Sequence, residues 1–447
     1  MSHGDHATHA DVIAMIRDHS REIGRPLGIL CDLSGPKIRI GPIPAGPVTL
    51  QAGDEIIVTT DKVDGTAQKV SVNYAQLPED VKPGQHILLD DGLLEWQVVD
   101  VTAPEVKCVV IRGGPLSSHK GLNLPNTRLR ISAITEKDRA DIEFGLEQGV
   151  DMFAVSFVKR AEDIREARGY MRSFGGELPL IAKIEKSEAI EDIEAVLEAA
   201  DGAMVARGDL GVEIPLEKVP HVQKRVIALC NKLGKPVITA TQMLDSMIRS
   251  ARPTRAEVTD VANAILDGTD AVMLSGETAS GSFPVEAVAM MNRIAIETET
   301  HYNHAQWIEF GAAPPGEKLD VADAISRAVA AIANDMDIRG ILCLTQGGST
   351  ARRVARYRPK GGILAYCEKA RTAQQLCLTW GVEAFARDGA IDVEVERRQG
   401  SEVQIRKAIS LFKDRNLLKP GDRLVVSAGI PLHEPGTTNL IRVVDVD

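Results

Sequence analysis

Five short apolar runs alternate with helix-like segments between residues 150 and 279, and this pattern restricts the possible folds more than any other feature. The runs occupy residues 152–158, 178–185, 203–209, 236–241 and 271–277. Apolar runs of this length suit strands that are buried on both faces, as in parallel sheets. Residues 187–200 lie between two runs and repeat apolar side chains at helical spacing. The alternation predicts βα units and an α/β fold, and the polar residues at the carboxyl ends of these runs are typical of a (β/α)8 barrel.

The rest of the chain divides into regions of different pattern. Residues 41–125 read as short alternating strands separated by turn signals such as Asp91-Gly92, which predicts a small inserted β-barrel domain. Helix and strand patterns return in residues 311–447, where we expect a C-terminal α/β domain. The barrel domain would then comprise residues 1–40 and 126–310. A chain of 447 residues is too long for one hydrophobic core, which agrees with several domains.

The bulk composition excludes several classes of protein. The net charge of −11 argues against a general nucleic-acid or membrane-surface binder. No apolar run is long enough to cross a membrane, and the first residues lack the pattern of a signal peptide. The six cysteines are scattered without a C-x-x-C pair, which favours reduced, mostly buried thiols. We therefore expect a cytoplasmic protein without nucleic-acid or membrane partners.

Charged and hydroxyl side chains gather where three predicted strands end. Lys183 and Glu185 are two residues apart in a strand and should point to the same side. Asp209 follows Gly208, which leaves room for a ligand near the backbone, and Thr241 ends a third strand. Two carboxylates with water and substrate oxygens are a usual magnesium site, and the ammonium group could neutralise a transferring phosphoryl group. A structural ion pair between Lys183 and Glu185 is the alternative interpretation.

Three long segments of the chain closely resemble the pyruvate kinase family. They are AKIEKSEAIEDIEAVLEAADGAMVARGDLGVEIP, PVITATQMLDSMIRSARPTRAEVTDVANAILDGTDAVMLSGETASG and HKGLNLP. The resemblance covers essentially the whole chain. It implies phosphoryl transfer from phosphoenolpyruvate to ADP, giving pyruvate and ATP in the last step of glycolysis, on a (β/α)8 TIM barrel. It also implies that residues 41–125 form a lid that closes over ADP or ATP and excludes water.

The resemblance assigns roles to individual residues near the barrel mouth. Lys183 matches the catalytic lysine beside the transferred phosphoryl group. Glu185 and Asp209 match the Mg²⁺ ligands. The backbone of Gly208 and the side chain of Thr241 match substrate contacts, and Thr241 lies near the position where the enolate is protonated.

Two further residues match positions near the lid. Arg39, in SGPKIR, matches an arginine that contacts phosphate. Lys120, in HKGLNLP, matches a lysine on the nucleotide side; a solvated surface charge is the alternative for this residue.

The chain departs from the family pattern at its beginning. Ser2-His3-Gly4 matches the loop after the second barrel strand, so the first two strands are missing, together with a phosphate-binding arginine and an asparagine of the monovalent-cation site. A barrel without two strands exposes sheet edges and loses core packing. We therefore expect Met1 to be an internal methionine of a longer natural protein, which N-terminal sequencing of that protein would test.

A second departure concerns potassium. Potassium-dependent members resemble D-T-K-G-P-E-I-R in the third strand, whereas residues 32–39 read D-L-S-G-P-K-I-R. Lys37 replaces the glutamate, and within the family this lysine marks members that do not need K⁺. An ammonium group can supply the charge of the bound cation, so we expect Mg²⁺ dependence without K⁺ dependence. A solvent-facing Lys37 without effect is the alternative.

The resemblance also bears on regulation and assembly. Thr345, Gly348, Ser349 and Thr350 belong to a loop that binds a phosphorylated effector in family members, with a later loop at residues 435–439. A plain turn without a ligand is the alternative interpretation. The family is commonly a homotetramer, and residues 252–262 lie where such members pack their subunits.

Other functions stay open from the sequence alone. A non-catalytic relative that binds phosphorylated metabolites is favoured by the missing strands and opposed by the intact Lys183, Glu185, Asp209 and Thr241. A magnesium-enolate aldolase would need no nucleotide lid. His3, His6 and His9 form H-x-x-H-x-x-H, which suggests an exposed helical turn more than a metal site, because spacing alone fixes no geometry.

Overall fold

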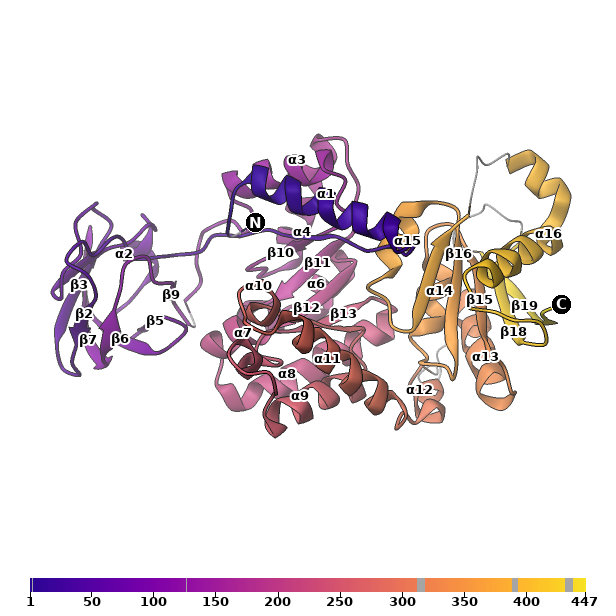
Figure 1. Ribbon diagram of the computed structural model, residues 1–447. Helices are drawn as coiled ribbons and strands as arrows, with labels where there is room; N and C mark the ends of the chain where they lie inside the picture. Colours follow the sequence, from indigo (N-terminus) through magenta and orange to yellow (C-terminus); the bar gives the residue numbers. More distant parts are fainter. Residues whose placement is uncertain (2, 126, 312–317, 388–392, 431–436) are drawn as a thin grey trace.

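A parallel sheet with its helices occupies the middle of the molecule, between a β-rich region and a second α/β unit (Figure 1). The computed structural model describes residues 1, 3–125, 127–311, 318–387, 393–430 and 437–447. Among these residues, no helix combines the length and apolar character needed to span a bilayer. All six cysteines are free thiols, and every one except Cys377 is buried.

The middle unit is built on six parallel strands that lie side by side in chain order. These are β1 (Leu30–Asp32), β10 (Met152–Val155), β11 (Leu180–Ile184), β12 (Gly202–Ala206), β13 (Val237–Ala240) and β14 (Ala271–Val272). The predicted α/β fold with a partial TIM barrel is confirmed, with β1 and β14 at the edges of the sheet in the described part of the chain. Because all strands run parallel, their carboxyl ends share one edge, where a ligand site is expected.

Helices cover this sheet and follow the strands that they connect. The helices of this unit of eight residues or more are α1 (His6–Glu22), α3 (Glu136–Glu147), α4 (Ala161–Ser173), α8 (Val219–Leu233), α9 (Arg255–Leu266) and α11 (Pro284–Glu299). Thr135 and Asp138 form the predicted capping box at the start of α3. The single helix predicted over 187–200 is wrong, because the chain leaves helical geometry at Asp192 and separates α5 (Ser187–Glu191) from α6 (Ile193–Ala199).

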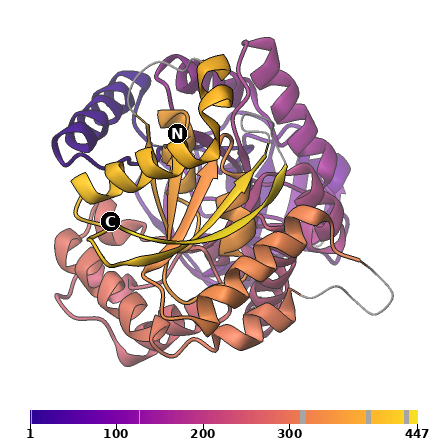
Figure 2. The same cartoon turned by 90° about the vertical axis from the view of Figure 1, so that its right-hand side faces the viewer.

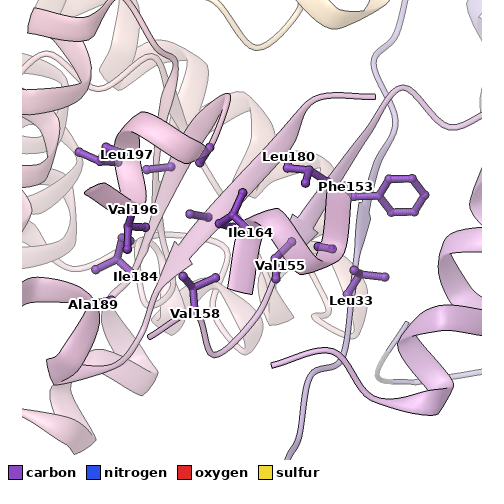
Figure 3. Packing of buried hydrophobic residues seen from close by; sticks show 14 of the residues in the cluster. Leu33, Phe153, Val155, Val158, Ile164, Leu180, Ile184, Ala189, Val196 and Leu197 are labelled. Carbon is purple, nitrogen blue, oxygen red and sulfur yellow. The ribbon is translucent and has the colours of Figure 1, made fainter. Parts of the chain in front are cut away.

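Buried side chains from strands and helices interdigitate behind the sheet (Figure 3). Phe153 and Leu180 come from neighbouring strands whose residues are paired in register. Val196 and Leu197 come from α6, and Ile164 from α4. Each is fully buried, so this core holds the strand ends in fixed positions.

The β-rich region contains two sheets. One has the strand order β4 (Lys69–Ser71), β3 (Glu55–Thr59), β7 (Glu105–Arg112), β6 (Leu94–Thr102), β5 (His86–Leu89) and β9 (Leu122–Asn123); the other pairs β2 (Val48–Leu50) with β8 (Gly114–Leu116). A short helix, α2 (Leu77–Asp80), lies between β4 and β5. Trp96 is fully buried in a core formed by these strands. Two extended segments connect the region to the parallel sheet and pair with each other at Arg39 and Gly121 (Figure 1).

The C-terminal unit is a five-stranded sheet between two helical layers. Its strand order is β17 (Val382–Ala386), β16 (Gly362–Cys367), β15 (Gly340–Thr345), β18 (Arg423–Gly429) and β19 (Thr438–Asp445), with only β19 antiparallel. One face packs on α13 (Val321–Asp335), α14 (Ser349–Ala355) and α15 (Ala370–Leu376). The other face packs on α16 (Val393–Asp414), a helix interrupted at Gly400, which Figure 2 shows crossing the sheet.

A buried arginine joins this unit to the base of the parallel sheet. Arg358 is fully buried, and its guanidinium donates to Asp270 Oδ1 at 3.0 Å, to Asn231 Oδ1 at 2.9 Å and to the Gly268 carbonyl at 2.5 Å. Trp380 stacks against the same guanidinium, with its ring centroid 5.1 Å away. Removing one partner of a buried pair leaves the other charge unpaired, so we infer that Arg358 holds the two units together.

We predict that Arg358→Leu lowers the free energy of unfolding by about 3–5 kcal/mol, because the Asp270 carboxylate would stay buried without its partner. Arg353 pairs with Asp320 at 3.2 Å and also with Asp323 near the surface, and Arg353→Leu is the matched control, with an expected loss of about 1 kcal/mol or less. Urea unfolding followed by tryptophan fluorescence measures both. Equal losses in the two variants would contradict the assigned role of Arg358.

Candidate functional site

Lys183 and Glu185 lie together at the carboxyl end of β11, as their spacing predicts. The ammonium nitrogen of Lys183 is 2.9 Å from Glu185 Oε1, and the two side chains are 13% and 1% exposed. The backbone N–H of Phe157 donates to Glu185 Oε2 at 2.9 Å. Phe157 has a positive φ of 54°, so this hydrogen bond is made by an unusual backbone conformation.

Two residues that the sequence reasoning did not select complete the surroundings of Lys183. Its ammonium group donates to Ser156 Oγ at 2.8 Å and lies 3.3 Å from Asp32 Oδ1. Asp32 is the last residue of β1, and Ser156 follows the last residue of β10. A polar residue directly after a buried strand was the available signal, because neighbouring parallel strands end at the same edge.

The charges in this cluster shift one another's protonation. Burial lowers the pKa of Lys183, but the Glu185 and Asp32 carboxylates outweigh it, so the pKa of the ammonium group is raised overall. Burial raises the pKa of Glu185, and repulsion from Asp209 adds to this against the attraction of Lys183. Lys183 therefore stays protonated near neutral pH. Additional positive charge nearby would stabilise the ionised form of Glu185.

Thr241 occupies a strained turn beside Gly208. Its φ is +68°, a conformation that costs a β-branched residue of the order of 1–3 kcal/mol. The Thr241 hydroxyl donates to the Ala240 carbonyl at 2.7 Å and accepts from the Gly208 N–H at 2.8 Å. Arg207 donates to the carbonyls of Ala240 and Thr241 at 3.2 and 2.7 Å, so its guanidinium holds the turn. The structure thus brings Gly208 and Thr241 together as predicted.

Asp209 reaches the site from a helix. The run 203–209 was expected to form one strand, but β12 ends at Ala206 and α7 (Arg207–Glu213) begins at the next residue. The strand prediction for 207–209 is therefore wrong, because the chain turns into a helix as it leaves the sheet edge. Asp209 still acts electrostatically on both Lys183 and Glu185.

A divalent cation suits this group of side chains. Among the described residues, no cluster of three or more His, Cys, Asp or Glu forms a ready-made metal cage. Glu185 and Asp209 repel each other, and Glu185 is almost fully buried. Two carboxylates completed by water and substrate oxygens are a common arrangement for Mg²⁺. The donor set therefore fits a cation that would relieve this repulsion.

Lys37, Arg39 and Lys120 lie along the paired linker segments. Arg39 donates to the His119 carbonyl at 2.9 Å, and the Lys120 ammonium pairs with Asp90 at 2.7 Å. In the described part of the chain, no hydrogen bond or ion pair joins Lys120 to Lys183, Glu185 or Thr241. Lys37 lines a cavity of about 30 Å³ together with Asp209, so Lys37 and Asp209 face one space.

The predicted effector loop is a turn closed by its own side chains. Thr345 Oγ1 accepts from the N–H of Gly348, which has a positive φ of 83° and precedes Ser349 at the start of α14. The hydroxyls of Thr350 and Thr438 are 2.9 Å apart. Residues 435 and 436 of the second predicted loop lie outside the described residues. A phosphate site here stays a prediction.

The three N-terminal histidines do not converge. His6 Nε2 lies 2.8 Å from Asp141 Oδ1, and its ring stacks on Phe144. His9 Nε2 lies 2.8 Å from the carbonyl of His3. His6 thus has a packing partner of its own, which agrees with the interpretation of this pattern as a helical turn.

Comparisons with known proteins agree along the chain. A family profile described as "Pyruvate kinase, barrel domain" matches residues 1–288, and one described as "Pyruvate kinase, alpha/beta domain" matches residues 323–444. Pyruvate kinase 2 of Synechocystis sp. is 48% identical over 446 residues, which cover 99% of this chain and 73% of that protein. The pyruvate kinase of Geobacillus stearothermophilus is 45% identical over 445 residues, covering 99% and 74%. That of Clostridium acetobutylicum is 42% identical over 446 residues, covering 99% and 92%.

Proposed function

The chain belongs to the pyruvate kinase family and has its phosphotransferase function, and we propose that the transfer takes place around Lys183 at the carboxyl edge of the parallel sheet. The reaction moves the phosphoryl group of phosphoenolpyruvate to ADP and leaves pyruvate and ATP. The observation that carries the placement is the contact of Lys183 with Ser156, Asp32 and Glu185, from three adjacent strand ends.

Lys183 would stabilise the charge that develops during transfer. A terminal oxygen of ADP attacks the phosphorus, the bond from phosphorus to the enolate oxygen breaks, and negative charge passes to that oxygen. A fixed ammonium group needs no reorganisation as this charge appears. The raised pKa of Lys183 supports this role and argues against proton transfer by the same group.

Glu185 and Asp209 would hold the divalent cation that the family generally needs, which we propose is Mg²⁺. When bound, Mg²⁺ supplies charge neutralisation for the phosphoryl oxygens and the enolate. The Phe157 N–H fixes one oxygen of Glu185, so the carboxylate already has a defined orientation. The strong desolvation of Glu185 supports this assignment, since an unpaired buried carboxylate is costly.

Thr241 and Gly208 would border the substrate where the enolate takes its proton. The Thr241 hydroxyl is fixed by one donated and one accepted hydrogen bond. A hydroxyl held in this way can orient a substrate or a water without moving itself. We place protonation of the enolate on this side, which completes the formation of pyruvate.

The β-rich region, residues 41–125, would act as the lid. Residues 1–40 and 126–310 would form the barrel domain, and residues 311–447 the C-terminal domain. Arg39 and Lys120 would contact phosphates of the substrate and the nucleotide when the lid closes. Their places on the linkers support this, because these segments join the β-rich region to the parallel sheet (Figure 1) and would move with it on closure.

Lys37 would replace the K⁺ of other family members. Its presence in one cavity with Asp209 supports this, because an ammonium group there contributes positive charge next to the metal carboxylates. We further propose a phosphorylated effector at residues 345–350, a homotetramer packed through residues 252–262, and a cytoplasmic location.

Turnover with a matched pair of variants tests the proposed site. Pyruvate formation from phosphoenolpyruvate and ADP with Mg²⁺, coupled to a dehydrogenase, measures this activity. Lys183→Met should lower kcat by about 10²–10³-fold, since a fixed charge at the reacting centre is lost. Lys232 is exposed on α8, and Lys232→Met should change little. Ligand binding to the wild-type chain without turnover would favour the non-catalytic relative instead.

Potassium titration tests Lys37. We predict that KCl added to a potassium-free assay leaves kcat nearly unchanged, because the ammonium group already supplies the charge. An increase of about tenfold or more, or 1.4 kcal/mol in the barrier, would refute this. Lys37→Met provides the matched variant, in which kcat should fall because the ammonium charge is removed.

Metal affinity should depend on pH through Glu185. Mn²⁺ can serve as a paramagnetic probe of the metal site. Burial raises the pKa of Glu185 above the usual 4.5, so its carboxylate becomes protonated at a higher pH than that of an exposed glutamate, and Mn²⁺ must displace this proton. Mn²⁺ affinity should be full above this raised pKa and fall as the pH decreases through it. Electron paramagnetic resonance titrations from about pH 8 to about pH 5 measure this. Affinity that is flat over this window, or unchanged in Glu185→Gln, would exclude Glu185 as a ligand.

A further inference from the structure

One buried carboxylate contacts both the β-rich region and the barrel. Glu213 is the last residue of α7 and is only 4% exposed. Its Oε1 accepts a hydrogen bond from the Lys186 ammonium at 2.6 Å and another from the Asn123 side-chain amide at 3.2 Å. Lys186 is itself buried at 8% exposure. A single oxygen thus links two parts of the chain that are far apart in sequence.

Lys186 connects this oxygen to the reacting centre. It directly follows Glu185, whose carboxylate pairs with Lys183. The Lys186 ammonium also lies 5.8 Å from the ring centroid of Phe157, the residue whose N–H donates to Glu185. A displacement of Lys186 would therefore shift the Glu185 carboxylate in two ways, through the adjoining backbone and through the hydrogen bond from Phe157.

Asn123 connects the same oxygen to the lid. It lies in β9, which pairs with β5 of the lid sheet at Leu88 and Leu89. The linker begins immediately afterwards and returns to the barrel. Asn123, Lys186 and Asp209 line one cavity, so both hydrogen-bond partners of Glu213 border the space that Asp209 also lines.

We propose that Glu213 is a positioning residue that couples the lid to the carboxylate of Glu185, with Asn123 as the lid contact and Lys186 as the barrel contact. The Lys186–Glu213 pair is buried, so neither charge can leave the other without a large penalty. The hydrogen bond to Asn123 is neutral on the lid side and can break at lower cost. Movement of the lid can therefore break the hydrogen bond from Asn123 to Glu213 while the Lys186–Glu213 ion pair stays in place.

Coupling of this kind is reciprocal. If the lid contact improves metal binding, metal binding must stabilise the lid contact by the same factor. The inference rests on the proposed function for the identity of the metal carboxylates, but hydrogen exchange and metal binding can be measured without turnover. Mn²⁺ alone is the probe, because its paramagnetism reports binding directly.

The experiment compares three variants of the full chain. Hydrogen exchange of residues 119–125 is followed with and without saturating Mn²⁺, and Mn²⁺ affinity is measured by electron paramagnetic resonance. Asn123→Ala changes no charge and removes only the lid side, whereas Glu213→Gln removes the ion pair. Gln97→Ala is the matched control, because this lid amide donates to the Gly84 carbonyl at 3.5 Å, a contact within the lid.

Mn²⁺ should slow exchange in residues 119–125 of the wild type and of Gln97→Ala. The effect should disappear in Asn123→Ala and Glu213→Gln, and Mn²⁺ affinity should fall by up to about tenfold, the scale typical of groups that support a metal ligand. Unchanged exchange on Mn²⁺ binding to the wild type, or Asn123→Ala behaving like Gln97→Ala, would overturn the coupling. Absence of Mn²⁺ binding would overturn it together with the metal site. Robust turnover without coupling rejects this inference alone, and coupling without turnover rejects the proposed function alone.

Discussion

The site depends on a charged lysine that is held inside a parallel sheet edge. Burial alone would drive Lys183 toward its neutral form, but Glu185 and Asp32 lie within about 3–3.5 Å of its nitrogen and reverse that tendency. The strands that supply these groups are buried on both faces, and their register is set by apolar packing (Figure 3). The charge can therefore be placed accurately only because the surrounding core is rigid.

Glu185 shows why the same arrangement favours a metal. One carboxylate oxygen lies against Lys183 and the other accepts from Phe157, yet its pKa is still raised by burial and by Asp209. One ammonium group thus does not neutralise two carboxylates in this environment. A divalent cation would supply the missing charge.

The sequence predicted these strands and the proximity of Lys183 to Glu185 because both follow from local patterns. Apolar runs identified β10, β11, β12, β13 and β14, and spacing placed Lys183 and Glu185 on one side of a strand. Two features could not be predicted in this way. The helix break at Asp192 is not marked by Gly or Pro, and the start of α7 at Arg207 depends on where β12 leaves the sheet. The roles of Asp32 and Ser156 depend on which strands are neighbours, which only the topology gives.

Buried ion pairs recur at both ends of the parallel sheet. At its amino end, Arg358 pairs with Asp270 and fixes the C-terminal unit to the base. At its carboxyl end, Glu213 pairs with Lys186 and contacts the β-rich region through Asn123. Such pairs add little net stability compared with apolar packing, but they resist any geometry that separates them. Apolar contacts are not directional, so charged contacts at the two ends help to give the attached units a defined orientation on the sheet.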